Sequence, residues 1–129
     1  AITLIEVLEH IPLELCCEFS IALASLLKDE GVMYLTVPHE NKPKSYKHFQ
    51  HFNYESLLKY FKDDFKVEKV KYIQRNSKIL MLLNMFMKNK IWIVNSNFIN
   101  NLFYKFYVNN YFPATQENCS RIYLKLIKK

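Results

Sequence analysis

Strand-like and helix-like patterns alternate along the first half of the chain, and this alternation limits the fold classes open to it. Short apolar, β-branched runs at 2–7 and 32–37 are typical of buried strands in a parallel sheet. Between them, residues 13–27 repeat apolar side chains at helical spacing after Pro12. This order predicts an α/β fold in which helices cover the faces of a sheet.

The segments that follow predict two strands of a different kind. Residues 54–62 form an expected helix with Asn53 as its N-cap. Residues 65–73 alternate apolar and charged side chains, which is the period-two pattern of an exposed or edge strand. Residues 121–127 alternate again and are expected to form the last strand. We expect the strand at 121–127 to run antiparallel beside the strand at 65–73.

Residues 77–112, between these two strands, differ from the rest in composition. The spacing predicts two amphipathic helices, at 78–88 and 97–110, so this region is a helical insertion. Residues 69–116 hold six lysines, one arginine and no acidic residue, whereas residues 1–68 carry a net charge of −4. A basic, aromatic-rich stretch suits an anionic partner, such as a membrane surface, a nucleic acid or a phosphorylated acceptor. The plainer interpretation is a solvated lysine face.

A few residue types exclude whole classes of function. The single glycine, Gly31, excludes any glycine-rich phosphate loop, because such loops need two or three glycines. Cys16, Cys17 and Cys119 have no metal-binding spacing and are expected as small core residues of a protein in the reducing cytoplasm. The longest apolar run, 79–87, is far shorter than a transmembrane segment. We therefore expect a cytoplasmic protein that contacts a membrane peripherally at most.

Carboxylates and imidazoles follow the carboxyl ends of the first two predicted strands, where ligands bind in open α/β sheets. Glu6, Glu9 and His10 follow the first strand, and His39 follows the second. The first three converge if residues 6–10 form a helical turn, and they would then suit a metal ion. The alternative is that Glu9 and His10 merely cap and orient the next helix.

Two further histidines, His48 and His51, lie in the loop before the helix at 54–62. Histidine is the natural general base near neutral pH and a common metal ligand. Either residue could instead serve only loop hydrogen bonding. Their expected position beside the same sheet edge as His39 favours a functional role.

Three segments together resemble a known family. They are ITLIEVLEHIP (2–12), SLLKDEGVMYLTVPHENKP (25–43) and KHFQHFNYESLLKYFKDDFKVEKVKYI (47–73). The combination resembles the C-terminal half of a class I S-adenosylmethionine-dependent methyltransferase of type 11/23. The resemblance covers residues 1–73 well and residues 119–129 loosely.

The resemblance implies that residues 1–129 are a partial methyltransferase domain with a Rossmann-like fold. The chain would supply strands four to seven, with the helical insertion between the last two. Ala1 lies inside a strand pattern, so we expect a piece of a longer protein. The glycine-rich, cofactor-binding loop would lie upstream, and the piece alone would be inactive.

Candidate site residues follow from the same resemblance. Ile5 and Glu6 match positions that line the methionine end of S-adenosylmethionine. His39, His48 or His51 would remove a proton from the methyl acceptor, because the loop that carries them covers the acceptor side.

A divalent metal is a second implication. Ubiquinone-type O-methyltransferases and small-RNA 2′-O-methyltransferases use an E-x-x-E-H motif in a metal site, and Glu6, Glu9 and His10 match that spacing. In the RNA branch a downstream histidine is also a ligand, a position that His48 or His51 could take. Such ligands suit Mg²⁺ or Mn²⁺. Other methyltransferases with the same motif bind no metal.

The sequence thus predicts methyl transfer to a small-molecule, lipid-linked or saccharide-linked acceptor. The alternatives are a metal-dependent RNA 2′-O-methyltransferase and a non-catalytic methyltransferase-like module for membrane or protein association. In each case the insertion at 77–112 would cap the acceptor site, contact a partner or simply pack its aromatic side chains onto the domain. Its basic and aromatic candidates are Lys78, Lys88, Lys90, Lys105, Trp92, Phe103, Tyr104 and Tyr107.

Overall fold

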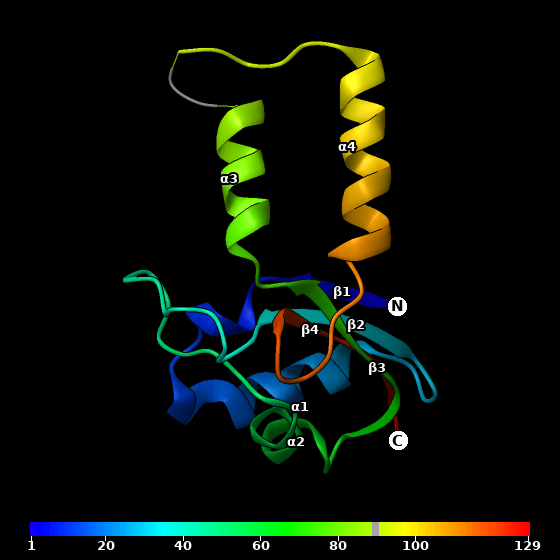
Figure 1. Ribbon diagram of the computed structural model, residues 1–129. Helices are drawn as coiled ribbons and strands as arrows, with labels where there is room; N and C mark the ends of the chain where they lie inside the picture. The colour runs from blue at the N-terminus through cyan, green and yellow to red at the C-terminus, as the bar shows by residue number, and fades with distance from the viewer. Residues whose placement is uncertain (89–90) are drawn as a thin grey trace.

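The computed structural model describes residues 1–88 and 91–129, and within them four strands form one open, mixed sheet (Figure 1). The strands are β1 (Ile2–Ile5), β2 (Val32–Pro38), β3 (Phe65–Arg75) and β4 (Cys119–Lys128). Their order in the sheet is β1-β2-β4-β3, and β1 runs parallel to β2. β4 runs antiparallel to β3, as expected for the last strand, and it also runs antiparallel to β2. The predicted α/β class is confirmed at this level.

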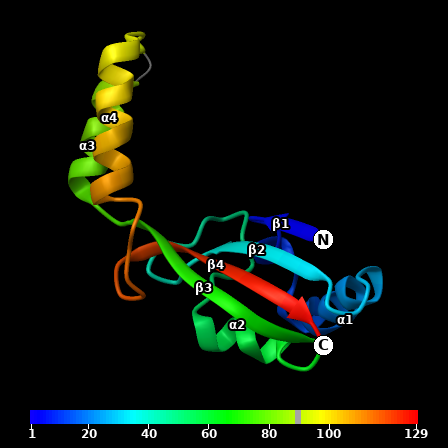
Figure 2. The same cartoon turned by 90° about the vertical axis from the view of Figure 1, so that its right-hand side faces the viewer.

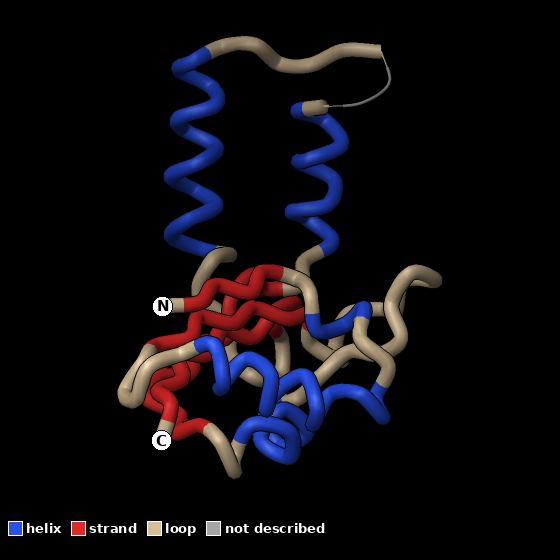
Figure 3. Tube along the Cα trace, turned by 180° about the vertical axis from the view of Figure 1, so that it is seen from behind, coloured by secondary structure: helices blue, strands red, loops and turns tan. Residues whose placement is uncertain are grey.

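Helices cover one face of the sheet. Two short 3₁₀ helices, η1 (Leu8–His10) and η2 (Leu13–Leu15), lead from β1 into α1 (Cys16–Leu26). α1 and α2 (Tyr54–Phe61) lie together on the same side of the sheet (Figure 3). α2 begins with a reciprocal capping box, in which Asn53 Oδ1 accepts from the Ser56 N–H at 2.8 Å and Ser56 Oγ accepts from the Asn53 N–H at 3.0 Å.

The hydrophobic core lies between these helices and the sheet. Alternate residues of β2 and β4 point into it, so that Leu35 lies opposite Leu124 in the antiparallel register. Burial of each such leucine or phenylalanine contributes about 1.5–3 kcal/mol to folding. Cys16 and Cys119 are buried as small core residues, whereas Cys17 is exposed, contrary to expectation. The other large core side chains are Met33, Val37, Phe52, Leu57, Phe61, Phe65, Ile122 and Leu126.

The first strand and first helix are shorter than their sequence patterns predict. Glu6 adopts φ 53°, in the left-handed region, which ends β1 at Ile5 and turns the chain into η1. The Glu6 N–H still donates to the Thr36 carbonyl at 3.0 Å, so the turn stays attached to β2. The helical pattern that begins at Leu13 forms η2 first and becomes α-helical only at Cys16.

The insertion forms two helices, α3 (Lys78–Met87) and α4 (Asn97–Asn110), close to the predicted bounds. Ser77 and Ser96 cap their N-termini by accepting from backbone N–H groups one turn ahead. The two helices project away from the sheet and from α1 and α2 (Figures 1 and 2). Lys90, one of the predicted basic residues, lies outside the described residues.

Candidate functional site

The candidate site is built where η1 meets the loop between β2 and α2. The Phe49 N–H donates to the Glu9 carbonyl at 2.9 Å, and His10 Nδ1 lies 3.0 Å from the Lys47 carbonyl oxygen. These two contacts join segments that lie nearly forty residues apart, since the loop folds back over the carboxyl end of β1. His48 is thereby held between its two tethered neighbours and beside η1.

Glu9, His10 and His48 form a compact group of potential metal ligands. Each offers one ligand atom, and these atoms all lie within 4.8 Å of one another. His10 Nε2 lies 4.0 Å from Glu9 Oε1, and the His10 and His48 rings meet edge to face with centroids 4.9 Å apart. The group shares two residues with the predicted set of Glu6, Glu9 and His10, but takes His48 in place of Glu6.

Backbone carbonyls determine which ring nitrogens are free. A carbonyl only accepts, so His10 Nδ1 must carry the hydrogen that faces Lys47, and in the neutral ring Nε2 then keeps its lone pair. His51 Nδ1 likewise donates to the Lys42 carbonyl at 2.9 Å, so its Nε2 accepts from His48 Nδ1 at 2.8 Å. The Nε2 lone pair of neutral His48 is then also free. This outer arrangement of donors is typical of histidines that bind metals.

The Glu9 carboxylate is the unusual member of the group. Its side chain is fully buried, and neither oxygen has a hydrogen-bond partner among the described residues. Burial raises the pKa of Glu9, and the nearby Glu6 carboxylate raises it further, although its own backbone N–H lowers it. A buried carboxylate without a hydrogen-bond partner is strongly unfavourable when ionised, so it favours either a proton or a cation. The donor set therefore fits a divalent cation.

The predicted cofactor residues lie beside this group rather than in it. The Glu6 carboxylate lies 3.2 Å from Arg121 Nε, on β4, and the Arg121 guanidinium also donates to the side chain of Gln74. Ile5, at the end of β1, leaves 66% of its surface exposed. The ion pair with Arg121 is a feature that the sequence did not reveal, because the two residues lie near opposite ends of the chain.

His39 lies apart from the metal-ligand group and is nearly enclosed, with only 2% of its surface exposed. Its Nδ1 accepts from the Asn41 N–H at 3.1 Å, and its ring meets the Tyr72 ring edge to face. Since Nδ1 accepts, the proton of the neutral ring is on Nε2, which finds no partner among the described residues. Burial lowers the pKa of His39 and also that of His51. In this state His39 has no free lone pair with which to take a proton.

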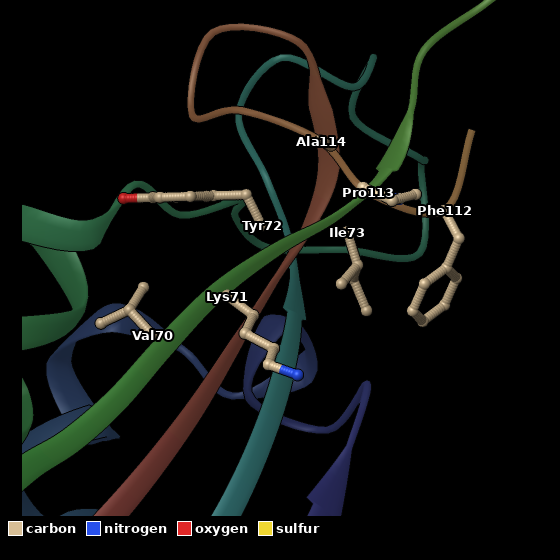
Figure 4. A pocket seen from close by; sticks show the side chains of 7 residues that line it. All are labelled: Val70, Lys71, Tyr72, Ile73, Phe112, Pro113 and Ala114. Atoms are coloured by element: carbon tan, nitrogen blue, oxygen red, sulfur yellow. The ribbon is translucent and has the colours of Figure 1, made fainter. Parts of the chain in front are cut away.

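A separate hollow of about 440 Å³ lies against β3 (Figure 4). Lys71, Ile73 and Phe112 point to one side of the strand, whereas Val70 and Tyr72 point to the other (Figure 4). None of the candidate catalytic, cofactor or metal residues lines it. This hollow therefore gives no support to a substrate site beside the histidines.

Comparisons with known proteins do not assign the chain to a family. No model of a protein family matches the sequence, and no curated protein matches it significantly. The resemblance to methyltransferases and the use of S-adenosylmethionine therefore remain predictions.

Proposed function

We propose that this chain supplies the acceptor side of an S-adenosylmethionine-dependent methyltransferase that acts on a small-molecule, lipid-linked or saccharide-linked acceptor. The observation that carries the proposal is the grouping of Glu9, His10, His48 and His51 beside the carboxyl end of β1, next to the parallel strand β2. Two parallel strands followed by an antiparallel pair also agree with the order that the resemblance implies.

The chemistry asks little of the protein beyond alignment and proton removal. When bound, the cofactor supplies a methyl group that its sulfonium already activates. His48 is the best placed base, because its Nε2 lone pair is free while its Nδ1 is held by His51. His51, anchored on the Lys42 carbonyl, positions the His48 ring and stabilises it when it is protonated.

Methyl transfer is tested on the natural gene product that contains these residues. The protein is incubated with S-adenosylmethionine labelled in its methyl group and with the lipid, saccharide, small-molecule and RNA fractions of its host cell. Label in any of the first three fractions supports the proposal. Label in RNA alone favours the RNA alternative, and absence of both transfer and cofactor binding favours a non-catalytic module.

Two variants separate catalysis from binding. His48→Gln should lower turnover by about 10²–10⁴-fold and leave the cofactor dissociation constant within about threefold, because a general base acts in the transition state. Tyr46→Phe, in the same loop and almost fully exposed, is the matched control and should change neither value. Equal losses of turnover and affinity in His48→Gln would remove its role as a base.

The Glu9–His10–His48 group favours a second candidate, the metal-dependent RNA 2′-O-methyltransferase. These three residues would hold Mn²⁺ or Mg²⁺, and the imidazole nitrogens favour Mn²⁺. An ion held by these residues would supply Lewis-acid chemistry, which would lower the pKa of a ribose hydroxyl. Glu9→Gln and His48→Ala should each weaken Mn²⁺ binding at least tenfold, as measured by electron paramagnetic resonance on the chain. Affinities equal to that of the unaltered chain would exclude the site.

A further inference from the structure

The two helices of the insertion expose an unusual amount of apolar surface. We call residues 77–112 the α3–α4 hairpin. Among the described residues, fourteen of the 21 large apolar side chains that are exposed belong to it. Soluble proteins rarely expose contiguous apolar patches beyond a few hundred Å², and larger ones mark interaction sites.

α3 is apolar on every side apart from Lys78 and Asn84, and a helix of this kind is normally buried. Leu80 is nevertheless its only buried residue, and α4 has none. Between the helices lies a hollow of about 480 Å³ that is lined only by apolar side chains, among them Phe86, Leu102 and Phe106. Most of the apolar surface of α3 and α4 is therefore buried neither between the two helices nor against the sheet.

The charge of the region identifies the kind of partner. Residues 69–116 carry a net charge of +7 without one acidic residue, and Lys78, Lys88 and Lys105 belong to the hairpin helices and their ends. A second copy of this face would bring the same uncompensated charge and be repelled. A nucleic acid would match the charge but leave the apolar side chains in water. A partner surface that is both anionic and apolar would match the positive charge and also bury the apolar side chains.

We propose that the α3–α4 hairpin docks on an anionic membrane and inserts its apolar side chains into one leaflet. At 1.5 Å per residue, α3 is about 15 Å long and α4 about 21 Å, whereas the hydrocarbon core of a bilayer is about 30 Å thick. No helix among the described residues is long and apolar enough to cross a membrane. The hairpin is therefore suited to partial insertion.

The far end of the hairpin carries the features of an interfacial anchor. Ile93 and Phe98 are exposed there, and 79% of the Phe98 surface is accessible. Trp92 precedes Ile93, and its Nε1 donates to the Phe86 carbonyl at 3.0 Å. Lys88, the C-cap of α3, pairs with Ile93 across the loop. Tryptophan and lysine are the side chains that prefer the boundary between headgroups and acyl chains.

Trp92 is the only tryptophan of the chain, so its fluorescence reports docking directly. The full chain is mixed with vesicles of phosphatidylcholine alone or with 30% phosphatidylglycerol added. With the anionic vesicles we expect the emission to move to shorter wavelength and to be quenched by lipids brominated in the acyl chain. Neither change should occur with phosphatidylcholine alone, and added salt should weaken binding.

Variants test the two parts of the surface. Lys88→Gln combined with Lys105→Gln should lower partitioning into anionic vesicles about thirtyfold, at roughly 1 kcal/mol for each lysine. Phe98→Ser should lower it about tenfold through lost apolar burial. Leu26→Ser is the matched control, because Leu26 is equally exposed at 76% but lies on α1, and it should leave partitioning unchanged. Circular dichroism verifies that each variant is folded.

The proposal does not depend on methyl transfer, since no cofactor or acceptor enters the experiment. Equal binding to both kinds of vesicle would overturn the role of charge, and absence of binding to either would overturn the proposal. A concentration-dependent dimer that Phe98→Ser abolishes, without vesicle binding, would assign the surface to a second copy instead. Binding to RNA that competes with vesicles and is insensitive to Phe98→Ser would assign it to a nucleic acid.

Discussion

His39 shows how one buried side chain can link stability to pH. Burial lowers its pKa in the folded protein, whereas the unfolded chain protonates it near 6.5. The contribution of neutral His39 to stability is therefore fully present above pH 6.5. It is lost as pH falls below that value, by at most about 1.4 kcal/mol per pH unit. We expect His39→Gln to flatten the decline between pH 7.5 and 5.5 in urea unfolding. An unchanged slope in His39→Gln would contradict this account.

Glu9 links stability to pH in the opposite direction to His39. Burial raises its pKa above the ordinary 4.5, so ionising it in the folded protein costs free energy that the unfolded chain does not pay. The contribution of protonated Glu9 to stability is fully present below pH 4.5. It is lost as pH rises from 4.5 toward the raised pKa of the folded protein. In the presence of a chelator, Glu9→Gln should therefore unfold at higher urea than the unaltered chain at pH 7, and the gap should close at pH 4. The exposed Glu14→Gln should show no such gap, and a lower midpoint for Glu9→Gln would show that its carboxylate is stabilising.

The sequence identified the residues of the candidate site, but it did not predict which of them lie together. Glu9 and His10 follow a strand, and their adjacency alone brings them together. Whether Glu6 or His48 joins them depends on contacts between distant segments. Glu6 turns away at φ 53° toward Arg121, and the loop tethers at Glu9 and Lys47 bring His48 in. No local spacing encodes either contact.

The α2 capping box is an element whose stability can be tested separately. Asn53 and Ser56 satisfy two backbone N–H groups that would otherwise lack partners at the helix start. Asn53→Ala should lower the unfolding free energy by about 1 kcal/mol in urea titration. Asn100→Ala, on the exposed surface of α4, should change it by less than about 0.5 kcal/mol. Similar losses of unfolding free energy in both variants would mean that the capping box does not stabilise α2.

Regular periodicity made some elements predictable and others less so. The period-two pattern at 65–73 identified β3, and the helical pattern at 97–110 gave the bounds of α4, because each pattern continues without interruption. The segment at 13–27 was less regular in structure than in sequence, since its first three residues form η2. Strand order depends on pairing across the whole chain. The parallel direction of β1 and β2 and the antiparallel placement of β4 beside β3 were foreseen, but the position of β4 between β2 and β3 was not.

In the whole molecule, the hairpin and the candidate site adjoin the same edge of the sheet. β2 ends at Pro38 opposite Arg121, and the His39 N–H donates to the Ser120 carbonyl at 2.8 Å. The Ser120 hydroxyl in turn donates to Asn76 Oδ1, one residue before the hairpin begins. A hairpin docked on a membrane would therefore bring this edge of the sheet toward the lipid surface. Among the proposed acceptors, this arrangement favours a lipid-linked one.

The hairpin leaves the sheet and returns to it at neighbouring points, so it should be removable. The Arg75 N–H donates to the Tyr111 carbonyl at 2.7 Å, and Leu80 is the only residue of α3 or α4 that is buried. Replacing residues 78–110 with Gly-Ser-Gly should therefore lower the unfolding free energy by only about 2 kcal/mol, the value of one buried leucine. Circular dichroism during urea titration should show a single cooperative transition, and vesicle binding should disappear. Loss of cooperative unfolding would mean that the hairpin stabilises the domain, and its apolar surface would then need another explanation.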